Sequence, residues 1–154
     1  MIEADRRRRP PLAVLAVLLL GTACADEAPS EPTLTIETAG GTVELRVEVA
    51  DDPAERQQGL MGRRALAPDA GMVFLRADPS TSGFWMKDTL IPLSVAFWDE
   101  EERILGTVDM EPCQTDPCPI YPAPGPWVGA VEVNQGYFEE HGVAAGDAVT
   151  LERG

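Results

Sequence analysis

The chain has 154 residues, with 12 Lys or Arg against 26 Asp or Glu, so its formal net charge is −14. This length suits one compact domain and argues against a multidomain enzyme. The scarcity of basic residues argues against a nucleic-acid-binding protein, because phosphate binding requires clustered Lys and Arg.

The first 23 residues have the features of an export signal. Four arginines at residues 6–9 precede an apolar run at 12–20, and small residues follow it. This order is typical of a secretory signal peptide. The apolar run is about half the roughly 20 residues that a membrane-spanning helix needs, so we expect removal of residues 1–23.

Cys24 directly follows the small residues, as in the lipobox of bacterial lipoproteins, in which this cysteine is acylated and becomes the new N-terminus. Gly21 stands where leucine is usual, with Leu20 one position earlier. We therefore expect an exported protein, anchored to the cell membrane through Cys24 and facing the periplasm or the cell exterior. An ordinary signal peptide is the alternative. A twin-arginine signal is disfavoured, because the polar and apolar pattern that usually follows the arginine pair is absent.

Removal of residues 1–23 would leave 131 residues with 8 basic and 24 acidic side chains, a net charge of −16. Such a surface repels anionic lipid headgroups, so an acyl chain would have to hold the protein at the membrane. Residues 24–32 are polar and contain two prolines, which predicts a flexible tether. Residues 33–154 form the single predicted domain.

Apolar and polar residues alternate on both sides of Gly40-Gly41, at 34–37 and 43–49, which predicts a β-hairpin. Asp52, Pro53 and Glu55 then have the spacing of a helix N-terminus, with aspartate as the cap and proline at the first helical position. A short helix is therefore predicted up to Gly59.

The rest of the chain is expected to hold further short strands and one more helix. The predicted strands are 72–75, 84–86, 93–98, 103–110, 127–133 and 148–151. A second short helix is predicted at 135–141, and a structured loop without regular elements at 111–126, where there are six prolines. About eight strands and two short helices predict a mostly β fold, a small single-domain barrel or sandwich.

Five segments carry a resemblance to a known family. They are residues 58–63, 71–74, 84–93, 132–136 and 142–147. The chain resembles, over nearly all of residues 40–152, the bacterial and archaeal family catalogued as "domain of unknown function 192". Asp88 stands where that family commonly has Asn, and Ser94 where it commonly has Asp. The resemblance implies a compact, mostly β domain that is often exported, and it brings no established chemistry.

Cys113 and Cys118 lie amid prolines with four residues between them. In an exported protein such a pair most often forms a disulfide. A redox or zinc pair is less favoured, because the spacing is not C-x-x-C and there is no second pair. Met86 and Met110 could join Cys113 in a copper(I) site, but Met86 is more simply a core residue. We predict no metal site and no cofactor.

Lys87 is the single lysine of the chain and follows Trp85-Met86. If Trp85 points inward, strand alternation directs Lys87 inward as well. An inward lysine needs an acidic partner. The available partners are Asp88, Asp109 and Glu132.

One interpretation is that Lys87 anchors a ligand in a pocket lined by Trp85, Phe97 and Trp98, since aromatic walls with few polar groups are typical of ligand sites. The candidate binding residues are Lys87, Trp85, Asp88, Trp98, Arg63 and Arg64, with the arginine pair at the border of the same cleft. The structural alternative is a buried ion pair or an exposed lysine at a strand end.

No nucleophile elbow, phosphate loop, metal motif or dinucleotide fingerprint is present. We therefore expect a membrane-tethered, extracytoplasmic binding or accessory domain without enzymatic activity. Its partner would be a small anionic or carbohydrate-like molecule, or an envelope protein. One alternative is an envelope hydrolase or lyase with Lys87 and a carboxylate as acid and base, in hydrogen-bond reach at the floor of a pocket. Another is a structural interaction protein, which an apolar surface patch without a pocket would favour.

Overall fold

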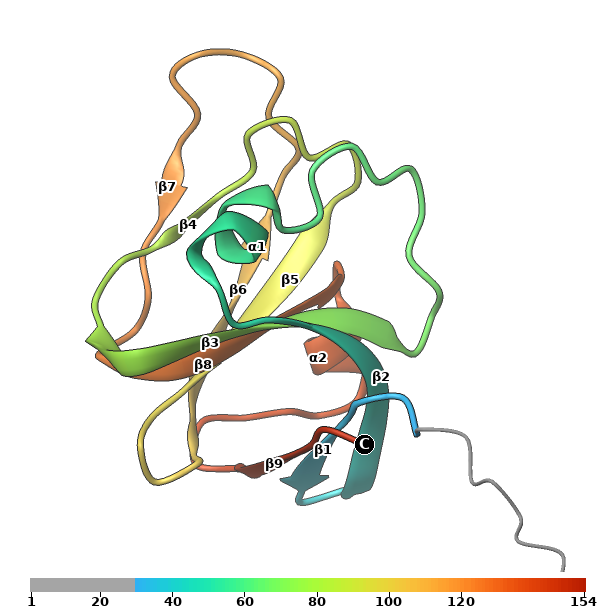
Figure 1. Cartoon of the computed structure of the whole chain (residues 1–154). Coiled ribbons are helices and arrows are strands. Elements are labelled where there is room, and N and C mark those ends of the chain that lie inside the picture. The colour runs from blue at the N-terminus through green and yellow to red at the C-terminus, as the bar shows by residue number, and fades with distance from the viewer. Residues whose placement is uncertain (1–29) are drawn as a thin grey trace, which may run out of the picture.

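The structure, a computed structural model, describes residues 30–154. The predicted signal peptide, Cys24 and most of the predicted tether lie outside these residues. The described chain is mostly β, as predicted, with nine strands and two short helices (Figure 1). None of its helices is long and apolar enough to span a bilayer.

Seven strands form one sheet in the order β6-β5-β8-β3-β2-β1-β9. Their bounds are β1 Thr33–Thr38, β2 Gly41–Ala50, β3 Ala70–Ser80, β5 Leu93–Trp98, β6 Ile104–Met110, β8 Trp127–Asn134 and β9 Ala148–Glu152. Strands β2 and β3 pair in parallel, and the other neighbours pair antiparallel.

The sheet curls so far that its two edge strands meet at one end. The N–H of Ile104 donates to the carbonyl oxygen of Asp147 at 2.9 Å, and the N–H of Val149 donates to the carbonyl oxygen of Glu102 at 2.9 Å. These bonds join the start of β6 to the start of β9, although the two strands are not paired along their length. The predicted barrel or sandwich is therefore a curled half-barrel (Figure 1).

Apolar side chains pack on both faces of the curled sheet, so there are two cores. The inner core fills the inside of the curl and is closed by Tyr137 and Phe138 of α2 (Tyr137–Glu140). The outer core lies between the outer face of the sheet and the segments that cover it. Its buried members are Ala50, Leu60, Met72, Phe74, Met86, Leu93, Val95, Phe97, Met110, Cys113, Trp127 and Ala130.

The hairpin and the first helix agree with the sequence prediction. Strands β1 and β2 pair through the Gly40-Gly41 turn. Helix α1 (Pro53–Gln58) begins at Asp52, whose Oδ1 accepts hydrogen bonds from the N–H groups of residues 54 and 55 at 2.7 and 2.9 Å. The Glu55 side chain accepts from the Asp52 N–H, which completes a capping box.

Three elements differ from the prediction. The proline-rich segment 111–126 contains a two-residue strand, β7 (Ile120–Tyr121), which pairs with β4 (Phe84–Trp85). This pairing joins distant segments, so local alternation does not reveal it. Strand β3 extends beyond the predicted strand 72–75 as far as Ser80, through residues that are mostly exposed. Helix α2 is shorter than the predicted helix 135–141, because Gly136, in a left-handed conformation, begins it.

Candidate functional site

Three adjoining cavities surround Trp85, between α1 and β4. The first, the lysine cavity, has a volume of about 310 Å³; it is lined by Ala54, Gln57, Gln58, Met61, Trp85, Lys87 and Asp88. The second, the Glu132 slot, has a volume of about 30 Å³; its polar lining residues are Arg56, Gln57, Gln58, Thr89 and Glu132, beside apolar and aromatic walls. The third, the arginine cavity, has a volume of about 130 Å³; it is lined by Arg56, Phe74, Arg76, Ser82, Gly83, Phe84, Trp85 and Trp127. Since Trp85 lines all three, we call them together the Trp85 groove.

The side chains of β4 alternate in the phase opposite to the one that the sequence analysis assumed. Trp85 is 43% exposed, whereas Met86 is fully buried in the outer core. Trp85 pairs with Ile120, which is also exposed, so both side chains are on the outer side of the β4–β7 ribbon. The condition on which an inward Lys87 depended, an inward Trp85, is therefore not met. Lys87 is half-buried, and its Nζ lies 5.6 Å from the centroid of the Trp85 ring.

No acidic residue among residues 30–154 pairs with Lys87. Within residues 30–154, the ion pairs join Arg63 to Glu48 and Arg153 to Asp51. Asp109 instead accepts a hydrogen bond from the Ser94 hydroxyl at 2.5 Å, and Ser94 in turn accepts from the Gly136 N–H at 2.9 Å. Lys87 is therefore available to a ligand at the wall of its cavity.

Backbone hydrogen bonds fix the turn that carries Lys87. The N–H of Thr89 donates to the carbonyl oxygen of Met86 at 3.1 Å, and the N–H of Asp88 donates to that of Cys113 at 2.9 Å. The N–H of Gly62 donates to the carbonyl oxygen of Asp88 at 2.9 Å. Two separate loops thus hold this turn in place.

Asp88 has a left-handed backbone, with φ of 54°. Aspartate and asparagine adopt this conformation more readily than other non-glycine residues. The backbone therefore accounts for Asp88 without a catalytic role for the carboxylate.

The other predicted binding residues do not reach this groove. Trp98 is 5% exposed and packs in the inner core, and Phe97 is fully buried in the outer core, so neither lines a pocket with Lys87. Arg63 pairs with Glu48, with 2.5 Å between its Nη2 and the carboxylate. Arg64 is exposed and lines none of the three cavities. The aromatic lining of the groove comes instead from Phe74, Phe84, Trp85 and Trp127.

Glu132 is a functional candidate that the sequence analysis considered only as a partner for Lys87. It lies in β8 between Met72 of β3 and Val95 of β5, and it is 4% exposed. No described residue forms a hydrogen bond or ion pair with its carboxyl group, and burial raises its pKa from 4.5 to about 8. The signal in the sequence was an acid in the middle of an apolar strand.

The predicted Cys113–Cys118 disulfide is present in the structure. Among residues 30–154, no group of three or more His, Cys, Asp or Glu side chains is arranged to hold a metal ion.

Comparison with known proteins places the chain in a family. The sequence profile of the family described as "DUF192: Uncharacterized ACR" matches residues 34–151. The chain belongs to this family. No curated protein shows a significant match to the chain.

Two solved structures resemble the family member described here. A protein of unknown function from Novosphingobium aromaticivorans DSM 12444 has a TM-score of 0.74 and 31% sequence identity, over 81% of this chain and 94% of that chain. A putative transcription regulator from Sinorhizobium meliloti 1021 has a TM-score of 0.72 and 32% identity, over 80% of this chain and 95% of that chain. Both support the curled half-barrel fold.

Four of the five segments that carry the DUF192 resemblance meet at the Trp85 groove. Residues 58–61 comprise the end of α1 and the turn after it, and Phe74 comes from β3. Residues 84–89 include β4 and the Lys87 turn, and Glu132 comes from β8. The fold thus brings together segments that are far apart in the sequence. For this reason we place the candidate site at the groove.

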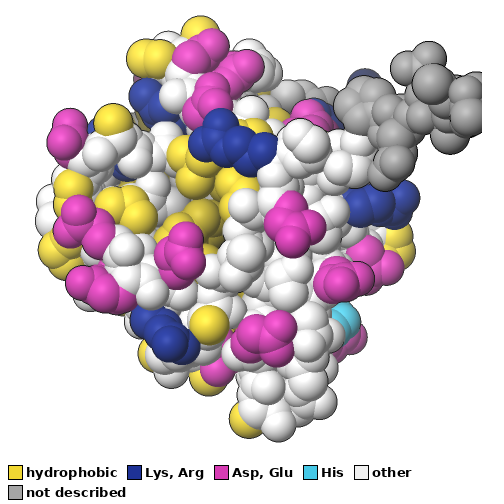
Figure 2. Space-filling view, turned by 60° about the horizontal axis from the view of Figure 1, so that its bottom comes forward, with side chains coloured by type: hydrophobic (Ala, Val, Ile, Leu, Met, Phe, Trp, Pro, Cys, Tyr) yellow, Lys and Arg dark blue, Asp and Glu magenta, His cyan; other side chains and the backbone are white. Residues whose placement is uncertain are grey.

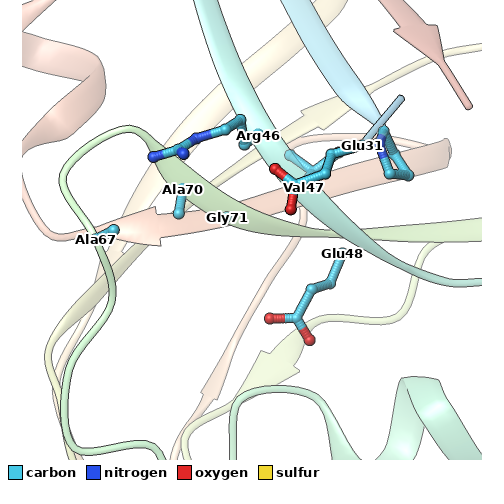
Figure 3. A pocket seen from close by; sticks show the side chains of 8 residues that line it. Glu31, Arg46, Val47, Glu48, Ala67, Ala70 and Gly71 are labelled. Carbon is cyan, nitrogen blue, oxygen red and sulfur yellow. The ribbon is translucent and has the colours of Figure 1, made fainter. Parts of the chain in front are cut away.

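A larger pocket lies elsewhere and lacks such a convergence. It has a volume of about 440 Å³ and is lined by Glu31, Pro32, Arg46, Val47, Glu48, Ala67, Ala70 and Gly71. Its charged side chains are exposed, and Figure 3 shows them spread apart, with no two of them meeting. It therefore has volume but no buried polar side chain to orient a ligand.

Proposed function

We propose that this DUF192 protein is an exported, membrane-tethered binding domain that holds a small polar ligand in the Trp85 groove. The single observation that carries the proposal is the position of Trp85, a partly exposed aromatic ring that borders three adjoining cavities. A large exposed ring at the centre of a concave surface is available for stacking on a ligand.

The polar groups around the ring suit a carbohydrate-like or anionic ligand. Gln57 and Gln58 offer amide donors and acceptors from α1, and Lys87 offers a cation on the same cavity wall. Figure 2 shows one face of the molecule, on which acidic side chains are widespread and basic side chains are few. On so acidic a protein, Lys87 is a site where an anionic group of a ligand can be held.

Tryptophan fluorescence tests this proposal directly. The chain has three tryptophans, and Trp98 and Trp127 are only 5% and 2% exposed, so the part of the emission that acrylamide quenches comes mainly from Trp85. Glucosamine, N-acetylglucosamine and glucose 6-phosphate are the probes. We expect at least one to protect Trp85 from acrylamide, and Trp85→Phe to remove the response. If none of the three protects Trp85, the binding proposal is wrong.

We propose further that the groove works close to a membrane, because Cys24 is acylated after export. The basic and apolar segments at residues 6–20 and the small residues before Cys24 support this step. The acidic composition makes an electrostatic attachment to anionic lipids unfavourable. Cells grown with a palmitate analogue should yield labelled protein, and Cys24→Ala should abolish the label. Unlabelled wild-type protein, or equal label in Cys24→Ala, would contradict acylation.

Glu132 supports a second candidate, an enzyme that acts on envelope material by acid–base catalysis. A carboxyl group with a pKa of about 8 retains its proton at neutral pH and can donate it. Lys87 is not its partner, because the two residues line different cavities and form no ion pair. Release of reducing ends from purified cell-wall glycan by the wild type, but not by Glu132→Gln, would favour the enzyme. Binding without release would favour the binding domain.

A further inference from the structure

We propose that the Glu132 slot receives a protonated primary amine of the ligand, with the Glu132 carboxyl group as its anchor. This inference rests on the proposed function, because it names the ligand group that enters the narrowest part of the Trp85 groove. It restricts the ligand to amines, such as amino sugars, whose remaining polar groups would contact Trp85 and Lys87.

The Glu132 carboxyl group is isolated within the described residues. Glu132 is only 4% exposed, and no described residue donates a hydrogen bond to its carboxyl group. Among residues 30–154, no fully buried side-chain oxygen or nitrogen lacks a partner, so the Glu132 carboxyl oxygens keep a small exposed area where they border the slot. Buried polar groups in proteins are almost always hydrogen-bonded, and leaving one without a partner costs stability. The carboxyl borders the slot, so a ligand or water in the slot can supply the missing partner.

The size of the slot suits an ammonium group. The slot has a volume of about 30 Å³, and roughly 10–15 Å³ of such space holds one water molecule. An ammonium group is about as large as a water molecule, so it fits. A sugar ring, a phosphate or a quaternary ammonium group is too large for this space without movement of the walls.

The lining of the slot holds one charged residue besides Glu132. Arg56 is the other charged residue in its lining, and its Nη1 donates to the carbonyl oxygens of Asp51 and Leu75 at 2.6 and 3.0 Å. The Nη1 of Arg56 is therefore bonded to the backbone, and Arg56 forms no ion pair with Glu132 within the described residues. Strands β3 and β4 contribute only Phe74, Phe84 and Trp85 to the slot, and aromatic walls favour a cation over an anion.

Binding of an amine then has a defined proton balance. In the free protein, burial raises the pKa of Glu132 to about 8, so the carboxyl group is mostly protonated at pH 7. An entering ammonium group favours the carboxylate, so Glu132 releases one proton to solvent and forms a charge-assisted hydrogen bond. No covalent bond forms or breaks in the ligand. A neutral hydroxyl ligand would instead accept a hydrogen bond from the protonated carboxyl group and would release no proton.

The experiment follows the Glu132 side-chain carboxyl by carbon-13 NMR in the full-length chain, with Glu132→Gln used to assign the resonance. The probes are n-propylammonium, n-propanol as its neutral analogue, and tetramethylammonium as a cation too large for the slot. We expect saturating n-propylammonium to lower the pKa of Glu132 by about one unit or more, a tenfold effect on proton affinity. The other two probes should leave this pKa unchanged.

Two results would overturn the inference: no shift with n-propylammonium, or a raised pKa with n-propanol, which would identify the carboxyl as a donor to neutral ligands. Arg64→Ala serves as a matched control, because Arg64 is an exposed cation that lines none of the three cavities, so this variant should leave the n-propylammonium shift intact. This readout does not use Trp85, so failure of the amine site and failure of the sugar-binding proposal are distinguishable.

Discussion

The backbone N–H of Asp88 donates to the carbonyl oxygen of Cys113 at 2.9 Å, so the disulfide-bonded loop holds the turn that carries Lys87. The N–H of Cys113 also donates back to the carbonyl oxygen of Met86 at 3.2 Å. The disulfide therefore stabilises the candidate site although neither sulfur lines it.

Replacement of both cysteines by serine should lower the free energy of unfolding by about 2 kcal/mol, since the loop between them is short. It should also speed amide exchange at Asp88, whose hydrogen bond depends on the loop. Urea denaturation and hydrogen exchange measure the two effects. Dithiothreitol should lower the free energy of unfolding of the wild type and leave that of the double variant unchanged. An equal decrease in both proteins would contradict the role of the disulfide.

Asp88 should tolerate asparagine better than alanine. Its φ of 54° favours residues that accept a left-handed backbone, so Asp88→Asn should change stability little, whereas Asp88→Ala should cost about 1 kcal/mol. Thermal or urea unfolding compares the two variants. If Asp88→Asn were as destabilising as Asp88→Ala, the carboxylate itself would be required and the backbone explanation would fail.

Gly129 makes room for Trp98. The two residues are paired between β8 and β5, and a methyl group on Gly129 would overlap the indole ring of Trp98. We expect Gly129→Ala to destabilise the protein by about 1–3 kcal/mol, as overpacking of a core does. Gly125→Ala is the matched control, because its methyl group would contact only Leu105, at 3.9 Å. Equal unfolding midpoints for the two variants would contradict this packing.

The burial of Glu132 should make stability depend on pH. Its pKa is about 8 in the folded protein and near 4.5 when unfolded, so the folded state binds the extra proton between these values. Stability should therefore fall as pH rises from about 4.5 to 8, by up to about 1.4 kcal/mol per pH unit, and this loss should be complete above pH 8.

Glu132→Gln should remove this contribution, because glutamine has a similar shape and does not titrate. Urea unfolding at pH 5, 6, 7 and 8 gives the stability of the wild type and of the variant at each pH. Taking the difference between the two cancels the contribution of the other acidic residues. As pH rises, the stability of the variant relative to the wild type should increase steadily. A constant difference would show that Glu132 has an ordinary pKa in the folded state.

Local patterns in the sequence predicted much of the fold. Alternation located the β1–β2 hairpin, the cap at Asp52 located α1, and the apolar run at 93–98 matched β5. These elements are determined by neighbours within a few residues. The β4–β7 pairing was missed because it joins segments 36 residues apart, and neither has a pattern of its own beyond two residues.

The candidate site was predicted only in part. The sequence identified Lys87, Trp85 and Asp88, which do lie together, because a single lysine beside a tryptophan is conspicuous in an acidic chain. Trp98 was included among the candidate binding residues because it is aromatic. The alternation of side chains in β5 directs it toward the inner core instead. Glu132 was not singled out because its distance from the Lys87 turn depends on how β8 and α1 pack, which no local pattern encodes.

The account rests on the Trp85 groove as the ligand site, and proton–nitrogen NMR of the three indole N–H groups tests it most directly. Glucosamine carries both a sugar ring for Trp85 and a primary amine for the Glu132 slot. We predict a saturable shift of the Trp85 indole resonance, with those of Trp98 and Trp127 much less affected. The backbone N–H resonances in the same spectrum provide the contrary result. An unchanged Trp85 indole, with saturable shifts confined to the backbone N–H groups of Glu31, residues 46–48, Ala67, Ala70 and Gly71, would place the ligand in the larger pocket and would contradict the account.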